Sequence, residues 1–449
     1  MLDVEYHYRE DKFLSDDLLQ ALEDRATRNV IRKLHLRCPN RGLLPSIFSS
    51  LTPEDETIRD SSRGVESIVL KHDETSDSFA SDFFASYRFP KLQHISLSGP
   101  MGLSLVPLIS HATTLVKLVL EGPNDVFAAV PPISQIILLL ISNPQLQSLT
   151  VGTLYSDDDC ESVPTPTASL PHLEQLTLDG RFWEVFPILR RLELPERMDN
   201  TTLRFYYSDL EGVNQQIIPY IRNYIRCDGR FGDRFGVFIT STPREFELRV
   251  CTIGVGCHAP DWMPPQKCPQ VEFKIVMLTA PPGAWEEILI DTLTLLPHES
   301  VVYLNSNFLV PAAVNAINNM PNIEYLHFVT TPVCKDFVSR GPDGPNGPQN
   351  HPSLRWVYLE DVKAQDGYID PLVTYLTHQT SANRPVSLRV FGKGVHLCPM
   401  PKGDLEDSVK ELIYEPEPKL RCPFGGCMWG CSLSHSSRLL PQDVHSSGV

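Results

Sequence analysis

The stretch Leu170 to Gly180 reads LPHLEQLTLDG and contains the frame L-x-x-L-x-L, whose last two leucines are Leu176 and Leu178. Successive side chains of a β-strand point to opposite faces. Leu176 and Leu178 would therefore share one face, while Gln175 and Thr177 would share the other. Alone, such a frame predicts an ordinary half-buried strand.

The same frame returns along the whole chain, and this repetition decides the fold class. The other copies are IRKLHL from Ile31, VESIVL from Val65, LQHISL from Leu92, LVKLVL from Leu115, LQSLTV from Leu146, LRRLEL from Leu189, IEYLHF from Ile323 and LRWVYL from Leu354.

The spacing of the copies indicates the type of repeat. The last positions of consecutive copies, Leu70, Leu97, Leu120, Val151 and Leu178, are 27, 23, 31 and 27 residues apart. Leucine-rich repeats recur every ~20 to 29 residues, and each supplies one strand of a parallel sheet. The sequence predicts an α/β fold, an irregular leucine-rich-repeat solenoid with parallel strands on its concave face and helices and loops on its convex face.

The repeat array sets the expected domain organisation, because repeats add along one axis and form one domain. Residues 1–29 are predicted to be an N-terminal cap with a short helix before a first strand at Ile31. Residues 30–432 are predicted to form the solenoid, with a lapse in the frame at 195–250, and residues 433–449 a flexible tail. Helices are expected at the apolar, helically spaced segments 131–144, 283–297 and 404–413, in a helix starting at Asp370, and around Ile217 to Ile225.

Composition excludes several classes of protein. A net charge of −16 repels phosphate backbones, so we expect no nucleic-acid partner. The longest apolar run, Ile136 to Ile141, is too short for the ~20 residues of a membrane-spanning helix. The N-terminus has no secretory signal, and 11 cysteines form no dense framework. These features predict a cytoplasmic or nuclear protein that is not bound to a membrane.

Clusters of chemically active residues do not match known site patterns. Cys422, Cys427, Cys431 and His435 lack the usual spacing of zinc ligands, and the same holds for Cys251, Cys257, His258 and Cys268. The acidic run from Asp157 to Glu161 lacks the rest of a calcium loop. We predict no metal, no cofactor and no catalytic residue. An unrecognised enzyme site around Asp228, Arg230, Asp233 and Arg234 is the alternative.

The polar face of the strands offers the best candidate binding surface. In the C-terminal repeats, the third and fifth positions of the frame become mostly aromatic. Aromatic side chains give large contact areas for little loss of entropy. We therefore predict a partner-binding surface, with mutual packing of the rings as the alternative. Its residues are Tyr303, Tyr325, His327, Trp356 and Tyr358.

Several segments, in their shared order, resemble the leucine-rich-repeat F-box proteins of mushroom-forming fungi. They are FPKLQHISLSGP from Phe89, TTLVKLVLEGP from Thr113, ISNPQLQSLTV from Ile141, VFPILRRLELPERM from Val185, IIPYIRNYIRCDGRFGDRFGV from Ile217, PLVTYLTHQTSANRPVSLRVFG from Pro371 and CPFGGC from Cys422. The resemblance covers about Ile31 to Cys427.

The resemblance implies a role in ubiquitin ligation. In that family, an N-terminal F-box docks on the cullin-ligase adaptor and the repeats hold a protein substrate. Residues 1–29 depart from the family because they lack the leucine-proline start of an F-box. They are expected to be a cap or a remnant, in a truncated sequence or a repeat-only relative. The predicted function is a protein-interaction module, with a repeat-only scaffold without a ubiquitin role, or the enzyme named above, as alternatives.

Overall fold

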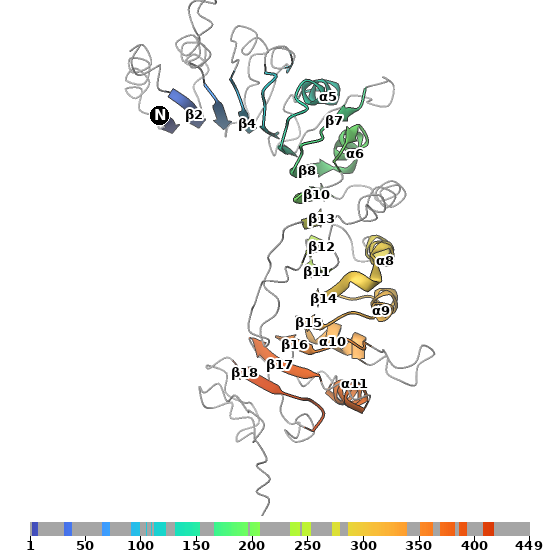
Figure 1. The fold of residues 1–449 in the computed structure, drawn as a ribbon. Helices are drawn as coiled ribbons and strands as arrows, with labels where there is room; N and C mark the ends of the chain where they lie inside the picture. Colours follow the sequence, from blue (N-terminus) through green and yellow to red (C-terminus); the bar gives the residue numbers. More distant parts are fainter. Residues whose placement is uncertain are drawn as a thin grey trace, which may run out of the picture. The chain divides into compact units, whose positions relative to one another are not determined.

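A computed structural model provides the fold of the chain (Figure 1). The residues that it describes are 2–7, 31–37, 65–71, 91–98, 105, 109, 112–122, 131–152, 166–195, 198–206, 234–242, 245–252, 272–278, 286–338, 351–361, 369–381, 386–392 and 407–416. The chain divides into two compact units, unit 1 from Met1 to Asp209 and unit 2 from Leu210 to Val449. The division falls within the segment 195–250, where the repeat frame lapses.

The structure is mixed α/β, and the sheet of unit 1 is parallel. Its strands follow one another in the order β1-β2-β3-β4-β5-β6-β8-β10. Their bounds are β1 Leu2–His7, β2 Ile31–Arg37, β3 Ser67–Lys71, β4 His94–Ser98, β5 Lys117–Glu121, β6 Ser148–Gly152, β8 Gln175–Arg181 and β10 Asn200–Tyr206.

The repeat frame sets the strand register in unit 1. Apolar residues at the same frame position lie opposite one another from strand to strand and are buried, so they stack into a continuous core. One such row is Leu34, Ile68, Ile95, Leu118, Leu149 and Leu176.

The described helices of unit 1 lie on one side of its strands (Figure 1). They are α5, Ile133–Ile141, and α6, Phe182–Arg190. Helix α5 confirms the prediction for 131–144. The buried leucines and isoleucines of the strands share the helix side, because alternate residues point to opposite faces. We call the opposite side the distal face. It carries the third and fifth positions of the frame.

A buried asparagine joins α5 to the neighbouring repeat. Asn143 is 1 % exposed and follows α5. Its Oδ1 accepts a hydrogen bond from the backbone N–H of Leu115 at 3.0 Å, and its Nδ2 donates to the carbonyl of Leu139 at 2.9 Å. The side chain therefore pairs backbone groups that a strand or helix would otherwise leave unmatched.

The interpretation of LRRLEL as a strand of the main sheet is wrong. Leu189 lies in α6, and the residues after it form β9, Leu192–Glu193, which pairs with β7, Ala168–Ser169, in a separate two-stranded sheet. The next strand of the main sheet is β10. There the fully buried Thr201 lies opposite Leu176. This strand has a threonine where the other copies of the frame in unit 1 have leucine or isoleucine, so it does not match the L-x-x-L-x-L frame.

The sheet of unit 2 is mixed. Strands β13, β12 and β11 pair antiparallel, and β11 then begins a parallel series β14-β15-β16-β17-β18. The bounds are β11 Phe235–Thr242, β12 Glu245–Thr252, β13 Glu272–Leu278, β14 Val301–Ser306, β15 Tyr325–Phe328, β16 Trp356–Glu360, β17 Ser387–Gly392 and β18 Leu412–Pro416. The antiparallel pairs replace the repeat geometry where the frame is degenerate.

The labelled helices of unit 2 also lie on one side of its strands (Figure 1). The described helices of this unit are α8 Glu286–Leu295, η1 His298–Ser300, α9 Pro311–Asn318, α10 Thr331–Val338 and α11 Ile369–Ser381. Helices α8 and α11 confirm the predictions for 283–297 and for a start near Asp370. In α8, Ile288, Leu289 and Leu293 are fully buried.

Two predicted terminal elements differ from the structure. Strand β1 precedes β2 and pairs with it in parallel, so Ile31 does not begin the first strand. Leu412 and Ile413 belong to β18 and not to a helix, because β17 offers them a parallel edge that short-range spacing cannot reveal. The predicted helices near Leu14 and Ile217 lie outside the described residues, as does the tail 433–449. None of the helices in the described ranges has the length and apolarity to cross a membrane.

Candidate functional site

The five residues predicted to bind a partner lie together on the distal face of unit 2. Tyr303, Tyr325 and Trp356 are opposite one another on β14, β15 and β16. His327 and Tyr358 form the next row and lie opposite each other on β15 and β16. We call these five residues the aromatic cluster. The alternation of the repeat frame is sufficient to place them on one face.

The cluster is largely buried. Tyr303, His327, Trp356 and Tyr358 are 2 %, 5 %, 6 % and 0 % exposed, whereas Tyr325 is half-buried. The predicted site is therefore not a row of exposed rings. Of its five members, Tyr325 presents the most surface to a partner, and the other four lie beneath or beside it.

The rings cover one another, which explains their burial. Trp356 and Tyr358 stack with centroids 5.7 Å apart and an interplanar angle of 16°. His327 is 5.8 Å from Tyr358 and 6.5 Å from Tyr303, and Tyr303 is 6.4 Å from Tyr325. These separations lie within the range of favourable aromatic pairs. The mutual packing that the sequence left as an alternative is present, and it is compatible with partner binding at Tyr325.

A polar chain runs through this apolar packing. His327 Nε2 is 3.0 Å from Glu360 Oε2. On the other side of the ring, His327 Nδ1 is 2.8 Å from Asn305 Nδ2 and 3.0 Å from the Tyr303 hydroxyl. Neither Asn305 nor Glu360 was singled out from the sequence. Asn305 lies two residues after Tyr303 and Glu360 two residues after Tyr358, so strand alternation could have found both.

The chemistry of these groups assigns the proton on His327. The hydrogen bond from the His327 ring lowers the pKa of Glu360, so Glu360 is an ionised acceptor and Nε2 carries the hydrogen. Nδ1 is then the acceptor for the Asn305 amide and the Tyr303 hydroxyl. Burial raises the pKa of Tyr303, so its hydroxyl stays protonated and can donate. This arrangement orients the rings.

Cations and further rings border the cluster. Phe238 on β11 is 5.2 Å from Tyr303, and the Arg249 guanidinium lies 4.8 Å from the Phe238 ring centroid. On β17, the guanidinium of Arg389 lies 4.9 Å from the ring of Phe391. Both are cation–π distances. The distal face of unit 2 thus combines buried rings with cationic groups and the half-exposed carboxylate of Glu360.

The alternative enzyme site has one member within the described residues. Arg234 forms an ion pair with Glu324, with 2.8 Å between Nη2 and Oε1, and Arg355 approaches the same carboxylate at 3.6 Å. These ion pairs join the residues that directly precede β11, β15 and β16, and they hold Glu324 in place. Asp228, Arg230 and Asp233 lie outside the described residues.

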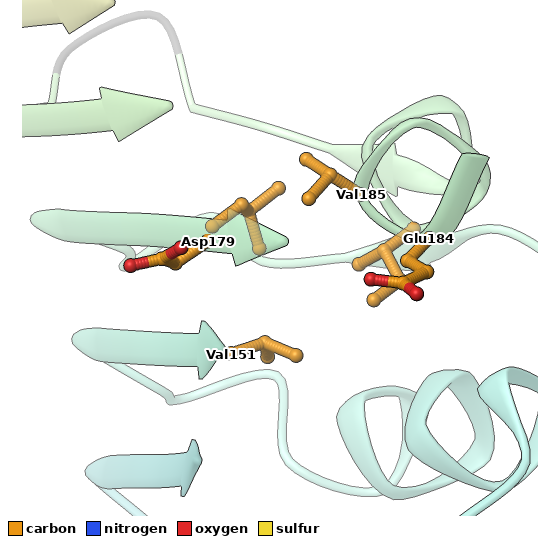
Figure 2. A pocket seen from close by; sticks show the side chains of 6 residues that line it. Val151, Asp179, Glu184 and Val185 are labelled. Carbon is orange, nitrogen blue, oxygen red and sulfur yellow. The ribbon is translucent and has the colours of Figure 1, made fainter. Parts of the chain in front are cut away.

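A hollow of about 10 Å³ lies between β6, β8 and α6 of unit 1, lined by Val151, Leu178, Asp179, Glu184, Val185 and Ile188 (Figure 2). It has room for about one water molecule.

Glu184 is 3 % exposed, and burial raises its pKa to about 7. Its Oε2 accepts a hydrogen bond from the backbone N–H of Arg181 at 2.9 Å, at the start of α6. A Cβ at Gly180 would lie 2.9 Å from this oxygen, so glycine leaves it room.

The two carboxylates of the hollow do not form an acid–base pair. Figure 2 shows that the side chains of Asp179 and Glu184 do not point toward each other. Asp179 instead forms an ion pair with Arg204 at 3.2 Å. Burial raises the pKa of Asp179, and the Arg204 charge opposes that rise. The hollow is a feature of packing and carries no catalytic arrangement.

Most members of the two cysteine clusters lie outside the described residues. Cys251 is buried on β12, while Cys257, His258 and Cys268 lie outside the described residues. The same is true of Cys422, Cys427, Cys431, His435 and the acidic run from Asp157 to Glu161. Within the described ranges, no group of three or more His, Cys, Asp or Glu residues could hold a metal ion.

Comparison with protein-family models and with curated proteins gives no match for this chain.

Proposed function

We propose that this chain is a non-catalytic protein-interaction module built as an irregular leucine-rich-repeat solenoid. The observation that carries the proposal is the aromatic cluster, which lies on the face of unit 2 that carries no described helix. The matched register of the frame leucines in unit 1 supports the repeat architecture. By resemblance, the partner is a protein substrate, as for the repeat domains of F-box ubiquitin-ligase receptors.

The binding surface centres on Tyr325 and Glu360. Tyr325 is half-buried because it packs against Tyr303 and also against the buried group of Trp356, Tyr358 and Ile413, and the part of its side chain that stays exposed is what a partner would contact. The Glu360 side chain is 36 % exposed and is oriented by His327. Aromatic rings are typical of interface hot spots, and a carboxylate that is already oriented loses little entropy when it binds. The buried members of the cluster hold these two groups in position.

Affinity purification from cell extract tests this proposal. We expect a Tyr325→Ala variant to lose partners that the unchanged chain captures. The matched control is Trp183→Ala, which removes an aromatic ring that is 43 % exposed on α6 of unit 1. Circular dichroism and thermal unfolding check that each variant remains folded. If a folded Tyr325→Ala protein retained every captured partner, the proposed surface would be wrong.

The ubiquitin role needs a separate measurement. Co-purification of the cullin-ligase adaptor would support a receptor role. Capture of other proteins without that adaptor would leave a repeat-only scaffold. We expect the chain to act in the cytoplasm or nucleus, which fluorescence microscopy of a tagged chain would test.

A further inference from the structure

A row of basic side chains crosses the distal face of unit 1. Lys33 on β2, Ser67 on β3, His94 on β4 and Lys117 on β5 are consecutive register partners. The side chains of Lys33, His94 and Lys117 are exposed. We call these three residues the cationic row. The row contains two lysines and a histidine, whereas the chain as a whole has a net charge of −16.

Acidic residues also lie near the row. Glu66 is bound to Arg32, with 2.8 Å between Oε1 and Nη1. The backbone of Asp3 on β1 is in register with Lys33. Glu121 is at the opposite end of β5 from Lys117, where it accepts a hydrogen bond from Ser98 at 2.8 Å. Neither His94 nor Lys117 has an acidic residue as its register partner on β3, β4, β5 or β6.

The electrostatics of His94 agree with this arrangement. Its pKa is lowered by partial burial first and then by the charges of Lys117 and Lys33, which outweigh the opposite effect of Glu66. Two lysines on different strands therefore act on the same imidazole. A negative group placed among them would reduce their repulsion and favour protonated His94.

We propose that the cationic row binds an extended partner segment rich in aspartate and glutamate. Neighbouring strands are ~4.8 Å apart, so the backbones at Lys33 and Lys117, three strands apart, are separated by about 14 Å. Side chains on one face of an extended segment recur every ~6.6 Å, so carboxylates at positions i and i+4 span about 13 Å. The row matches carboxylates distributed along a peptide better than one compact phosphate.

The cationic row belongs to unit 1 and shares no residue with the aromatic cluster of unit 2. The row and the cluster are on different units, so each can be inactivated without altering the other. The short side chains beside the row, Ser67, Ser96 and Ser148, leave room for a peptide backbone across the strands.

Fluorescence anisotropy with a labelled peptide of six Glu-Ser repeats tests the proposal on the full chain. We expect binding that weakens between 50 and 300 mM salt, because exposed charge pairs are screened. Lys33→Gln and Lys117→Gln should each weaken binding roughly 2- to 5-fold, and the double variant about 10-fold. Lys410→Gln, an exposed lysine of unit 2, makes the same charge change and should leave binding unaltered.

NMR titration of the His94 ring gives an independent readout, with His94→Gln identifying the signal. We expect its pKa to rise when the Glu-Ser peptide is added and to stay constant with a Gln-Ser peptide. Equal binding by the Lys33→Gln/Lys117→Gln double variant would overturn the proposal. So would displacement of the peptide by inorganic phosphate at equal concentration, or tighter binding of a DNA oligonucleotide, since these would indicate a compact phosphate or a nucleic acid as the ligand.

Discussion

The buried carboxyl group of Glu184 gives the most direct test of the packing around α6. Its pKa of about 7 lies above the ~4.3 of an exposed glutamate. The folded chain therefore retains a proton that the unfolded chain loses near pH 4. Stability from this residue is highest below about pH 4 and decreases as pH rises to about 7.

Glu184→Gln keeps the size of the side chain and an oxygen that accepts from the Arg181 N–H, but it removes the charge. At 1.36 kcal/mol per pKa unit, a shift of this size corresponds to about 3 to 4 kcal/mol of stability if screening by solvent is neglected. The adjoining hollow has room for water, so we expect about 1 to 2 kcal/mol. The difference in the free energy of unfolding, variant minus unchanged chain, should therefore be larger at pH 8 than at pH 4 by this amount.

Urea unfolding at pH 4, 6 and 8 measures the difference, and hydrogen exchange of α6 gives a local readout. The matched control is Glu174→Gln, which makes the same charge change at an exposed position. It should show no comparable pH dependence. If Glu184→Gln and the unchanged chain differed by the same free energy at every pH, Glu184 would not titrate as a buried acid and the reasoning would be refuted.

Three further predictions concern other parts of the two cores. Leu176→Ala should lower the free energy of unfolding by about 2 to 5 kcal/mol because Leu176 is 1 % exposed, whereas Thr177→Ala on the distal face should cost less than about 1 kcal/mol in the same urea assay. Asn143→Ala should cost about 1 to 3 kcal/mol by leaving the buried Leu115 N–H unmatched, and thermal unfolding would contradict this if its midpoint did not fall. Burial lowers the pKa of His351 to about 4, so the stability that this residue contributes should decrease as pH falls from about 6.5 to 4. Hydrogen exchange of α10 and α11 should become faster over this pH range, and the acceleration should be smaller in a His351→Gln variant.

The short-range sequence pattern was sufficient to predict much of the fold and the five residues of the aromatic cluster. The L-x-x-L-x-L frame predicted which residues of β3, β4, β5 and β6 are buried, because strand alternation depends only on residue order. The same alternation placed Tyr303, Tyr325 and Trp356 on one face. Asn305 lies opposite His327, at the fifth position of its own strand, and Glu360 lies two residues past the fifth position of LRWVYL, so the same alternation also places these two polar residues on this face.

The sequence by itself determined the α/β class and the faces of the strands, since both follow from the periodicity of apolar residues. The tertiary structure decided what depends on distant partners. The pairing of β10 with β8 places Thr201 opposite Leu176, at a position where the repeat frame has leucine. Leu412 lies in a strand because β17 offers it an edge to pair with. The rings of Tyr303 and Tyr358 are buried because residues from several strands cover them. Local pattern specifies the direction of a side chain, whereas its burial depends on what the rest of the chain places above it.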